Sequence, residues 1–428
     1  MNKPTKVFYN GTIITLDPAL PQGEAMAVAG DKILAVGTNE DISSLAGPGA
    51  ETNDLAGRVI VPGFNDSHMH LLNWGLGLSG VDLTKARSVP ELIRLGQEFL
   101  AEHPRREWLV GRGWNEENFG EKVSPTKADL DQISRSRPVV FIRACGHICT
   151  ANSKALEKAG ITQDTANPPG GSIDRSGRGG EPTGILRENA IALVTKLIPS
   201  PTKTDLREII RQASRSAAAL GLTTVQSNDL NGAGSFDTEL AVYRKLAAEN
   251  ELPIRINLQA TMPTIQDIAA YLKVRKEGQV PNSYLTLGPL KLYADGSLGG
   301  RTAALTYPYK DEPGTCGMPL YEQAQLDELV GFAARGNLQV AVHAIGDLAL
   351  DMILLSFERA KEKRPQWSAR PRVVHCQIAR RQQFLKMSQL GIVADIQPIF
   401  VPTDLHFVEE RIGRENTAYA YAWRTMLQ

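Results

Sequence analysis

The sequence predicts an α/β fold: a (β/α)8 barrel with a small β-sandwich portion at its N-terminus and a large insertion after the first barrel strand. Three observations predict it. Residues 1–58 consist of short apolar runs between Gly, Pro, Asn and Asp, which is typical of strands and turns. From Val59 onward, short apolar runs alternate with longer helical patterns, as in parallel βα units. Residues 75–203 then follow the first barrel strand, where a βα loop usually has roughly 2–6 residues.

Two turn signals organise the β-sandwich portion, residues 1–58. In KVFYNGTIITLD, Asn10-Gly11 stands between two strand-like runs, which predicts a hairpin. AMAVAGDKILAVG repeats the pattern around Gly30-Asp31. We therefore expect a small β-sheet domain here.

A helix with clear periodicity opens the main part of the barrel. Its apolar side chains follow helical spacing, and Gly221 stands where a C-terminal cap belongs. These side chains are Leu206, Ile209, Ile210, Ala213, Ala217 and Leu220. The strand LTTVQSN follows at once, as expected of a βα repeat.

Seven barrel strands can be recognised, although a closed barrel of this type needs eight. They are RVIVPGF, LTTVQSN, PIRINLQA, PLKLYAD, LQVAVHA, RVVHCQ and GIVADIQP. The last segment, AYAYAWRTMLQ, has a helical pattern. We expect the first barrel strand in residues 59–74 and the remainder of the barrel, without its eighth strand, in residues 204–428.

The insertion, residues 75–203, contains strand-like and helical stretches of its own. Among them are EWLVGRGW, RPVVFIRACGHICTANSKALEKAG and the Gly/Pro-rich NPPGGSIDRSGRGGEPTG. Because the first barrel strand leads directly into it, we expect it to form a subdomain over the barrel mouth.

Composition restricts the classes of partner. Lys+Arg and Asp+Glu are both 47, so no basic excess indicates a nucleic acid or an anionic membrane. We find neither a signal peptide nor a run of roughly 20 apolar residues. Four cysteines in 428 residues are most simply reduced thiols. We expect a cytoplasmic protein that acts on a small molecule; the oligomeric state stays open, and a homo-oligomer is compatible with the sequence.

Four of the seven histidines follow barrel strands. His68 and His70 belong to the first strand, where side chains at i and i+2 point to one side. His343 ends the fifth strand and His375 the sixth. The C-terminal ends of parallel barrel strands form one mouth, so these imidazoles should converge there. Imidazole is a good zinc ligand. The alternative is that each histidine is a hydrogen-bonded structural residue, which we would favour for any one of them alone.

Lys291, in the fourth strand, is unusual because an ammonium group is costly to bury in a barrel core. Its side chain could reach the surface, as lysine often does. Alternatively it could lose its positive charge near metals, for instance as a carbamate formed with CO2. Spacing alone does not decide between the two.

Five segments in order make the resemblance to a known family specific. VPGFNDSHMH, GHICTANSKAL, KLYADGSLGGRTAAL, VAVHAIGDLALD and RVVHCQ resemble the amidohydrolase superfamily, and among its branches the N-substituted formamide deformylases. The resemblance covers nearly the whole chain. It implies a metal-dependent hydrolase that attacks a C–N bond, of an amide or formamide, with a metal-activated water in a distorted TIM barrel.

Carried over position by position, the resemblance implies one or two divalent metal ions, zinc by preference. The implied ligands are His68, His70, Lys291, His343 and His375, and Lys291 is carbamylated in many members with two metals. In the insertion, the resemblance implies that Trp114, His147 and Asn152 line the substrate pocket.

One departure from the family pattern concerns the catalytic residue. Members carry an aspartate after the eighth strand, which takes a proton from water and passes it to the leaving nitrogen. That position would lie beyond Gln428, so the chain is either a truncated version of a longer protein or an incomplete natural product. We expect it to be poorly stable or inactive unless the missing segment is supplied. The alternative function is a catalytically impaired relic or binding protein with the same fold. Family members also often carry Glu and His where this sequence has Val374 and Phe400.

Other polar residues have simpler interpretations. In CGHIC, Cys145, His147 and Cys149 could bind zinc, but buried thiols are the better interpretation. We expect Asp347 to cap a helix. Asp295 is either a pocket residue or polar only because it ends a strand, and Asp395 is read as ordinary strand polarity.

Overall fold

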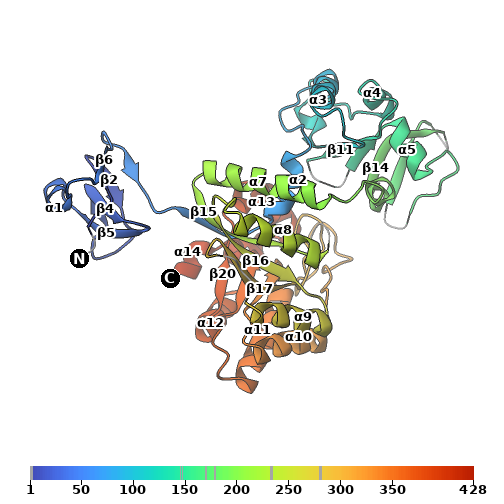
Figure 1. Ribbon diagram of the computed structural model, residues 1–428. Coiled ribbons are helices and arrows are strands. Elements are labelled where there is room, and N and C mark those ends of the chain that lie inside the picture. Colours follow the sequence, from blue (N-terminus) through green and yellow to red (C-terminus); the bar gives the residue numbers. More distant parts are fainter. Residues whose placement is uncertain are drawn as a thin grey trace. The chain divides into compact units, whose positions relative to one another are not determined.

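The computed structural model describes residues 3–144, 146, 148–168, 171–177, 180–231, 235–278 and 282–428. The chain divides into two compact units (Figure 1). The first comprises Met1–Asn65 together with Gly221–Thr224, and the second comprises Asp66–Leu220 and Val225–Gln428. His147, one of the predicted pocket residues, and Cys145 lie outside the described residues.

The first unit contains two small sheets and one helix. The four-stranded sheet has the order β5 (Lys32–Gly37), β4 (Ala25–Ala29), β1 (Lys6–Tyr9), β6 (Glu51–Asp54). The three-stranded sheet has the order β3 (Gln22–Gly23), β2 (Thr12–Ile14), β7 (Val59–Ile60). The helix is α1 (Asn39–Leu45), and its Ile42 packs on Val7, Ala25 and Ala27 to form the core of this unit.

The two predicted turns have different outcomes. The turn at Gly30, with φ at +61°, joins β4 to β5 as a hairpin. The hairpin expected at Asn10-Gly11 is wrong, because β1 and β2 belong to different sheets. Here the N–H of Gly11 donates to Glu24 and that of Thr12 to Arg58. A side chain at Gly11 would lie 2.4 Å from Leu55, so glycine lets the backbone pass closely from one sheet to the other.

The second unit is built on the seven-stranded parallel sheet predicted for the barrel (Figure 1). Across the sheet, its strands are β20 (Val393–Asp395), β19 (Arg372–His375), β18 (Val340–Ala344), β17 (Leu285–Tyr293), β16 (Arg255–Thr261), β15 (Leu222–Leu230) and β8 (Phe64–Met69). No eighth strand joins this sheet within the described residues. The first strand begins at Phe64 rather than Val59, because Val59 and Ile60 pair with β2 instead.

Helices alternate with these strands along the chain. They are α7 (Lys203–Ala219), α8 (Phe236–Ala248), α9 (Ile265–Lys276), α10 (Gln323–Arg335), α11 (Asp347–Lys363), α12 (Arg381–Leu390), α13 (Phe400–Ile412) and α14 (Trp423–Leu427), with a 3-10 turn at Arg414–Tyr419. The predicted periodic helix is α7: Thr202 and Asp205 form its capping box, and Gly221, with φ at +84°, follows its end. Its buried face includes Leu206, Ile210 and Ala217.

The insertion contains a six-stranded sheet of its own. Its order is β13 (Gly171–Arg175), β14 (Pro182–Glu188), β12 (Ile148–Ala151), β11 (Val139–Arg143), β10 (Leu109–Trp114), β9 (Val81–Asp82). Its helices are α2 (Leu71–Leu78), α3 (Val89–Glu102), α4 (Lys127–Asp131), α5 (Ser153–Ala159) and α6 (Ala192–Thr195), with 3-10 turns at Glu116–Asn118 and Asn189–Ile191. Two apolar clusters form its core, one around Leu186 and one around Phe141.

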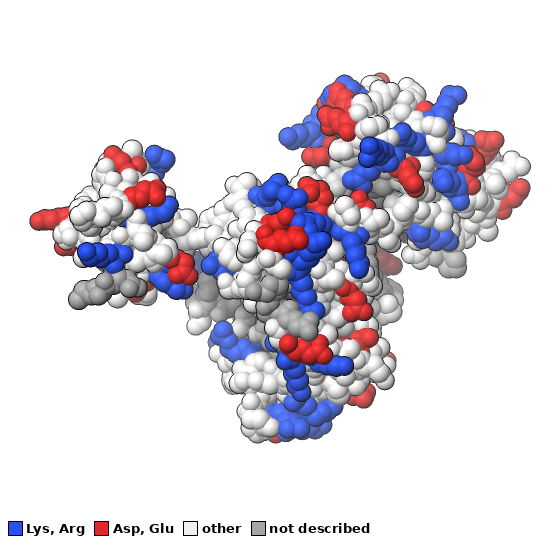
Figure 2. Space-filling model, viewed as in Figure 1, with Lys and Arg blue, Asp and Glu red and all other residues white. Residues whose placement is uncertain are grey.

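Surface charge agrees with the balanced composition. In Figure 2, acidic and basic side chains are interspersed over the visible face. Among the described residues, none of the helices combines the length and the apolar character that a membrane crossing requires.

Candidate active site

The four strand-end histidines come together at one point of the seven-stranded sheet. The ring centroids of His68 and His70 are 5.2 Å apart, those of His68 and His375 5.5 Å, and those of His343 and His375 4.6 Å. His68 lies on β8 and His70 directly follows that strand, and their i, i+2 spacing places the two rings side by side. Parallel pairing of β18 with β19 places His343 opposite Val374, so His343 and His375 lie one register position apart on neighbouring strands. We call these four residues the histidine cluster.

His68 is held by one ring nitrogen and leaves the other unpaired. It is 1% exposed, and its Nδ1 lies 3.1 Å from the amide oxygen of Gln259 on β16. An amide oxygen only accepts, so Nδ1 carries the proton and Nε2 keeps a lone pair. Nε2 is buried without a hydrogen-bond partner. Burial, reinforced by Lys291, lowers the pKa of His68 far below its usual range, so the ring is neutral.

His375 ends β19 with an unusual backbone. Its φ is +73° and that of Cys376 is +49°, so two successive residues with side chains lie in the left-handed region. The Nδ1 of His375 is also buried without a partner. Burial and the neighbouring His343 lower the pKa of His375 well below its ordinary value. Strained backbone of this kind gathers at functional sites.

His343 is oriented from the loop that follows β17. Its Nε2 lies 2.8 Å from the carbonyl oxygen of Gly296 and 3.4 Å from a carboxylate oxygen of Asp295. Nε2 therefore carries the proton, and Nδ1 is the nitrogen that can bind a ligand. Asp295 is fixed in turn, because it accepts hydrogen bonds from the N–H groups of Ala304, Ile345 and Gly346. Asp295 is thus a buried partner of the histidine cluster.

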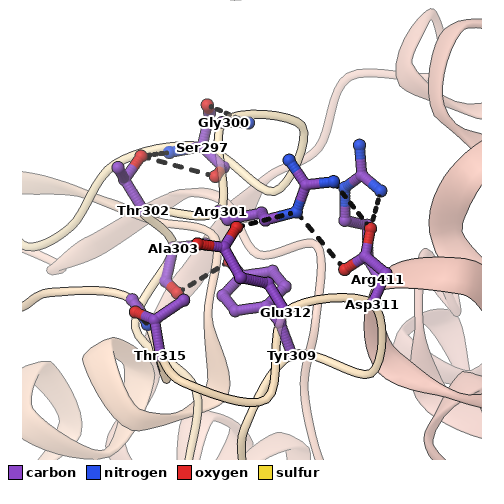
Figure 3. Close-up of polar contacts among 11 residues, drawn as sticks. Ser297, Gly300, Arg301, Thr302, Ala303, Tyr309, Asp311, Glu312, Thr315 and Arg411 are labelled. Atoms are coloured by element: carbon purple, nitrogen blue, oxygen red, sulfur yellow. Dashed lines mark hydrogen bonds and ion pairs between the residues drawn. The ribbon is translucent and has the colours of Figure 1, made fainter. Parts of the chain in front are cut away.

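The loop carrying Asp295 is held by ion pairs and hydrogen bonds (Figure 3). Arg301 lies 2.8 Å from Asp311, which also pairs with Arg411 of α13. Within the loop, Tyr309 donates to the carbonyl oxygen of Ala303. These contacts give the partner of His343 a fixed support.

Lys291 is fully buried beside the histidine cluster. Its Nζ has no hydrogen-bond partner and lies 3.9 Å from the ring centroid of Tyr293. The alternative in which this side chain reaches the surface is therefore wrong, since its exposed fraction is 0%. Burial lowers the pKa of Lys291 to about 7, with Asp395 raising it and Arg372 lowering it further. Near neutral pH a large fraction of the amine is unprotonated.

A buried ion pair lies below the cluster and was not anticipated. Arg372 of β19 donates to Asp395 of β20, to Gln226 of β15 and to the carbonyl oxygen of Ser67 of β8. Asp395 is 3% exposed, so reading it as ordinary strand polarity was wrong. The contacts connect the two edge strands of the sheet, together with the Nε2 of Gln397, which donates to the carbonyl oxygen of His68.

The predicted pocket residues of the insertion are placed elsewhere. Trp114 is buried in the insertion and donates to the carbonyl oxygen of Phe141. Asn152 caps α5, accepting from Ala155. Neither makes a contact with the histidine cluster among the interactions of the described residues. Their part in substrate binding stays a prediction. Cys149 is a buried thiol whose pKa is raised to about 12 by burial.

The donor chemistry of the cluster suits a divalent metal. As the side chains lie, no group of three or more His, Cys, Asp or Glu among the described residues forms a ready metal site. The buried nitrogens of His68, His375 and Lys291 nevertheless lack partners, and buried polar atoms rarely do. Neutral imidazole is the form that binds metal. The chemistry of the residues present therefore fits a metal ion.

Comparisons with known proteins identify the family of this fold. A family model described as the amidohydrolase family matches residues 51–428. The chain is 33% identical over 423 residues to the YtcJ protein of Bacillus subtilis (strain 168), covering 98% of this chain and 78% of that protein. The chain belongs to the amidohydrolase family. The predicted superfamily and the predicted α/β barrel fold are thereby confirmed.

Two further relatives of this amidohydrolase are informative. The N-substituted formamide deformylase of Arthrobacter pascens is 27% identical over 404 residues, which cover 90% of this chain and 71% of that protein. The crystal structure of an uncharacterized metal-dependent hydrolase from Pyrococcus furiosus is 29% identical, with a TM-score of 0.78. The match covers 99% of this chain and 83% of that one. Membership of the family makes this protein a hydrolase.

Two further carboxylates of this amidohydrolase, those of Asp347 and Asp404, accept hydrogen bonds within the protein. Asp347 begins α11 but does not cap it, so that prediction was wrong; the cap residue is Gly346. The Asp347 carboxylate instead accepts from the N–H and the hydroxyl of Thr306. Asp404 accepts from the hydroxyl of Tyr421. We expected the aspartate that follows the eighth strand in family members to be missing from this sequence. That expectation stays untested.

Proposed function

We propose that this amidohydrolase is a metal-dependent enzyme that hydrolyses a C–N bond, of an amide or formamide, in a small molecule. The observation that carries the proposal is the histidine cluster, in which buried ring nitrogens of His68 and His375 lack partners at the C-terminal end of a parallel sheet. The relation to an N-substituted formamide deformylase supports the type of bond. We also expect, from composition, that it acts in the cytoplasm without a nucleic acid or membrane partner, as a monomer or a homo-oligomer.

The residues proposed to hold one or two divalent ions, zinc by preference, are His68, His70, Lys291, His343 and His375. When bound, such an ion lowers the pKa of water and polarises a carbonyl. Lys291 would bind as a carbamate: its unprotonated amine attacks CO2, an N–C bond forms as one C=O π bond opens, the electron pair of that bond moves onto oxygen as negative charge, and the nitrogen loses one proton to water. The burial that holds its pKa near 7 favours this reaction, since only the free amine is nucleophilic.

The surrounding residues have positioning roles in this proposal. Gln259 fixes the tautomer of His68, and Asp295 with Gly296 fixes that of His343. Each leaves a lone pair available, so the imidazoles are oriented before a ligand binds. The ion pair of Arg372 and Asp395 supports the strand ends from below.

A second candidate is a catalytically impaired binding protein with the amidohydrolase fold. It is favoured by the state of the buried carboxylates. Asp295 accepts three backbone hydrogen bonds and Asp395 is paired with Arg372. Neither is free to move a proton between water and a leaving nitrogen. Such a protein would bind a metal ion and a small molecule without turnover.

The test is hydrolysis of N-formylbenzylamine by the purified chain, before and after dialysis against a chelator. We expect turnover that the chelator abolishes and zinc restores. Metal content should fall in His68→Ala and His375→Ala, but not in His406→Ala, whose ring lies exposed on α13 outside the cluster. Bound metal without turnover would favour the second candidate. Turnover that resists the chelator would exclude the metal-dependent mechanism.

A further inference from the structure

A polar pocket of about 240 Å³ opens beside His70. It is formed by the C-terminal ends of β15, β16 and β17 and by the start of α2. The residues that matter for what it binds are Asn73, Asn228, Asp229, Asn231, Thr261 and Tyr293. Because His70 belongs to both the pocket and the histidine cluster, a substrate at the cluster would extend into this space.

Directed hydrogen bonds fix the donors on one wall. The hydroxyl of Thr261 donates to the amide oxygen of Asn228 at 3.1 Å. The amide nitrogen of Asn228 then donates to the phenol oxygen of Tyr293 at 2.5 Å. That oxygen also hydrogen-bonds with Thr261, so the Tyr293 hydroxyl is held in a network of three polar side chains that line the pocket. Asn73, exposed on α2, and Asn231 add amide groups that both donate and accept.

The carboxylate of Asp229 already lies at the N-terminus of α2, where the helix dipole favours an anion. The first N–H groups of α2 donate to the hydroxyl of Ser227 and to the carboxylate of Asp229, so the positive end of the helix is taken. Asp229 is 2% exposed and also accepts from the hydroxyl of Tyr243. Burial raises the pKa of Asp229 to about 6, so it is largely ionised at neutral pH.

The described lining holds no lysine or arginine. Lys291 lies against the ring of Tyr293 but does not line the pocket. A carboxylate entering this space would meet Asp229 and lose water without gaining a lysine or arginine partner, which is costly. A neutral amide or hydroxyl would instead be matched by Tyr293 and the asparagine amides.

We infer that this pocket receives a neutral hydrogen-bonding group of the substrate and selects against a carboxylate at the same place. The inference rests on the proposed function in one respect, namely that the scissile carbonyl lies at the histidine cluster. It deepens that function, because it favours N-acyl amines and N-acyl amino acid amides over N-acyl amino acids.

Two compounds that differ only in the group expected to enter the pocket test this inference. They are N-formylglycinamide, which carries a neutral amide there, and N-formylglycine, which carries a carboxylate. For the purified chain with zinc, we measure kcat/KM for both, and their affinities by ligand-observed NMR. We expect the amide to be preferred at least about tenfold, a difference of about 1.4 kcal/mol.

A matched pair of variants assigns the preference to the pocket. Asn73→Lys places a cation at the pocket and should reduce the preference several-fold. Leu78→Lys adds the same charge at the other end of α2, outside the lining, and should leave the preference unchanged.

The outcomes separate this inference from the proposed function. Hydrolysis of both compounds with equal or greater preference for N-formylglycine overturns the pocket inference and leaves the function standing. Selective binding of N-formylglycinamide without hydrolysis overturns the proposed function and leaves the pocket inference standing. An equal change of preference in both lysine variants also overturns the inference, since the charge would then act from outside the pocket.

Discussion

Single residues around the histidine cluster act through hydrogen bonds rather than through charge alone. Asp295 is the clearest case, because one carboxylate joins His343 to three backbone N–H groups of two separate segments. Losing such a partner typically weakens metal binding by about 10–100-fold. The role of Asp295 can therefore be measured without reference to turnover.

We predict that Asp295→Asn lowers the affinity for zinc by about 10–100-fold, because His343 loses its carboxylate partner. Competition with a chromophoric chelator measures the affinity directly. Asp237→Asn, on the exposed first turn of α8, is the control and should bind zinc as the parent does. Equal affinity of all three proteins would contradict the positioning role.

Asp229 predicts a dependence of stability on pH. Its pKa is raised from 3.8 to about 6 by burial, so the folded state holds its proton more tightly than the unfolded chain. The stability it contributes is full below about pH 4 and is lost as pH rises through 6. Asp229→Asn should remove this decline, on the order of 1–3 kcal/mol.

Urea unfolding between about pH 2 and pH 7 checks the prediction for Asp229 and covers the range in which Asp205 titrates. Asp205 provides a control of opposite sign, because hydrogen bonds with Thr202 lower its pKa. Its stabilising effect is lost as pH falls, so Asp205→Asn should flatten the acid side of the curve instead. A decline that persists unchanged in Asp229→Asn would show that other groups cause it.

At the scale of elements, α2 connects the cluster to the helices outside the sheet, since it starts directly after His70 and packs on α7. Its two glycines differ in surroundings. A side chain at Gly75 would lie 2.7 Å from Ile209 and 3.0 Å from Ala213 of α7, whereas one at Gly77 would meet nothing within 4 Å. The helix therefore contains a matched pair of test positions.

We expect Gly75→Ala to destabilise the fold by about 1–3 kcal/mol, because α2 must move away from α7. Gly77→Ala should be neutral or stabilising by up to about 1 kcal/mol, since alanine favours a helix. Thermal unfolding of the two variants measures whether their stabilities differ as expected. Similar melting temperatures would mean that the contact between α2 and α7 is not tight.

Elements were predictable where the signal is local. The periodicity of α7 and the i, i+2 spacing of His68 and His70 need no information from distant residues. The start of the first barrel strand was misplaced, because Val59 and Ile60 are as strand-like as Phe64 and only pairing with β2 separates them. The partners Gln259, Arg372 and Asp395 were missed for the same reason: each is a polar residue in a strand whose contact lies across the sheet.

At the scale of the whole molecule, the buried ion pair joins the edges of the seven-stranded sheet. Arg372 contacts β8, β15 and β20 from β19, so one side chain connects four of its strands. Removing one member of a buried pair leaves the other charged and unpaired, which costs about 3–5 kcal/mol.

We therefore predict that Arg372→Met destabilises the second unit by about 3–5 kcal/mol, and that the double variant Arg372→Met/Asp395→Leu recovers most of the loss. Denaturant unfolding of the parent, both single variants and the double variant measures the coupling. Losses that simply add would show that the two charges act independently.

The left-handed backbone at His375 and Cys376 has a consequence for loop exchange. Two such residues in succession cannot continue a strand, so β19 stops at this level whatever sequence comes next. The position of the His375 ring along the strand direction is thus set by the backbone of His375 and Cys376, and not by the segment that follows. A segment transplanted from a relative after Cys376 should alter which molecules are admitted while leaving the ring at its original depth.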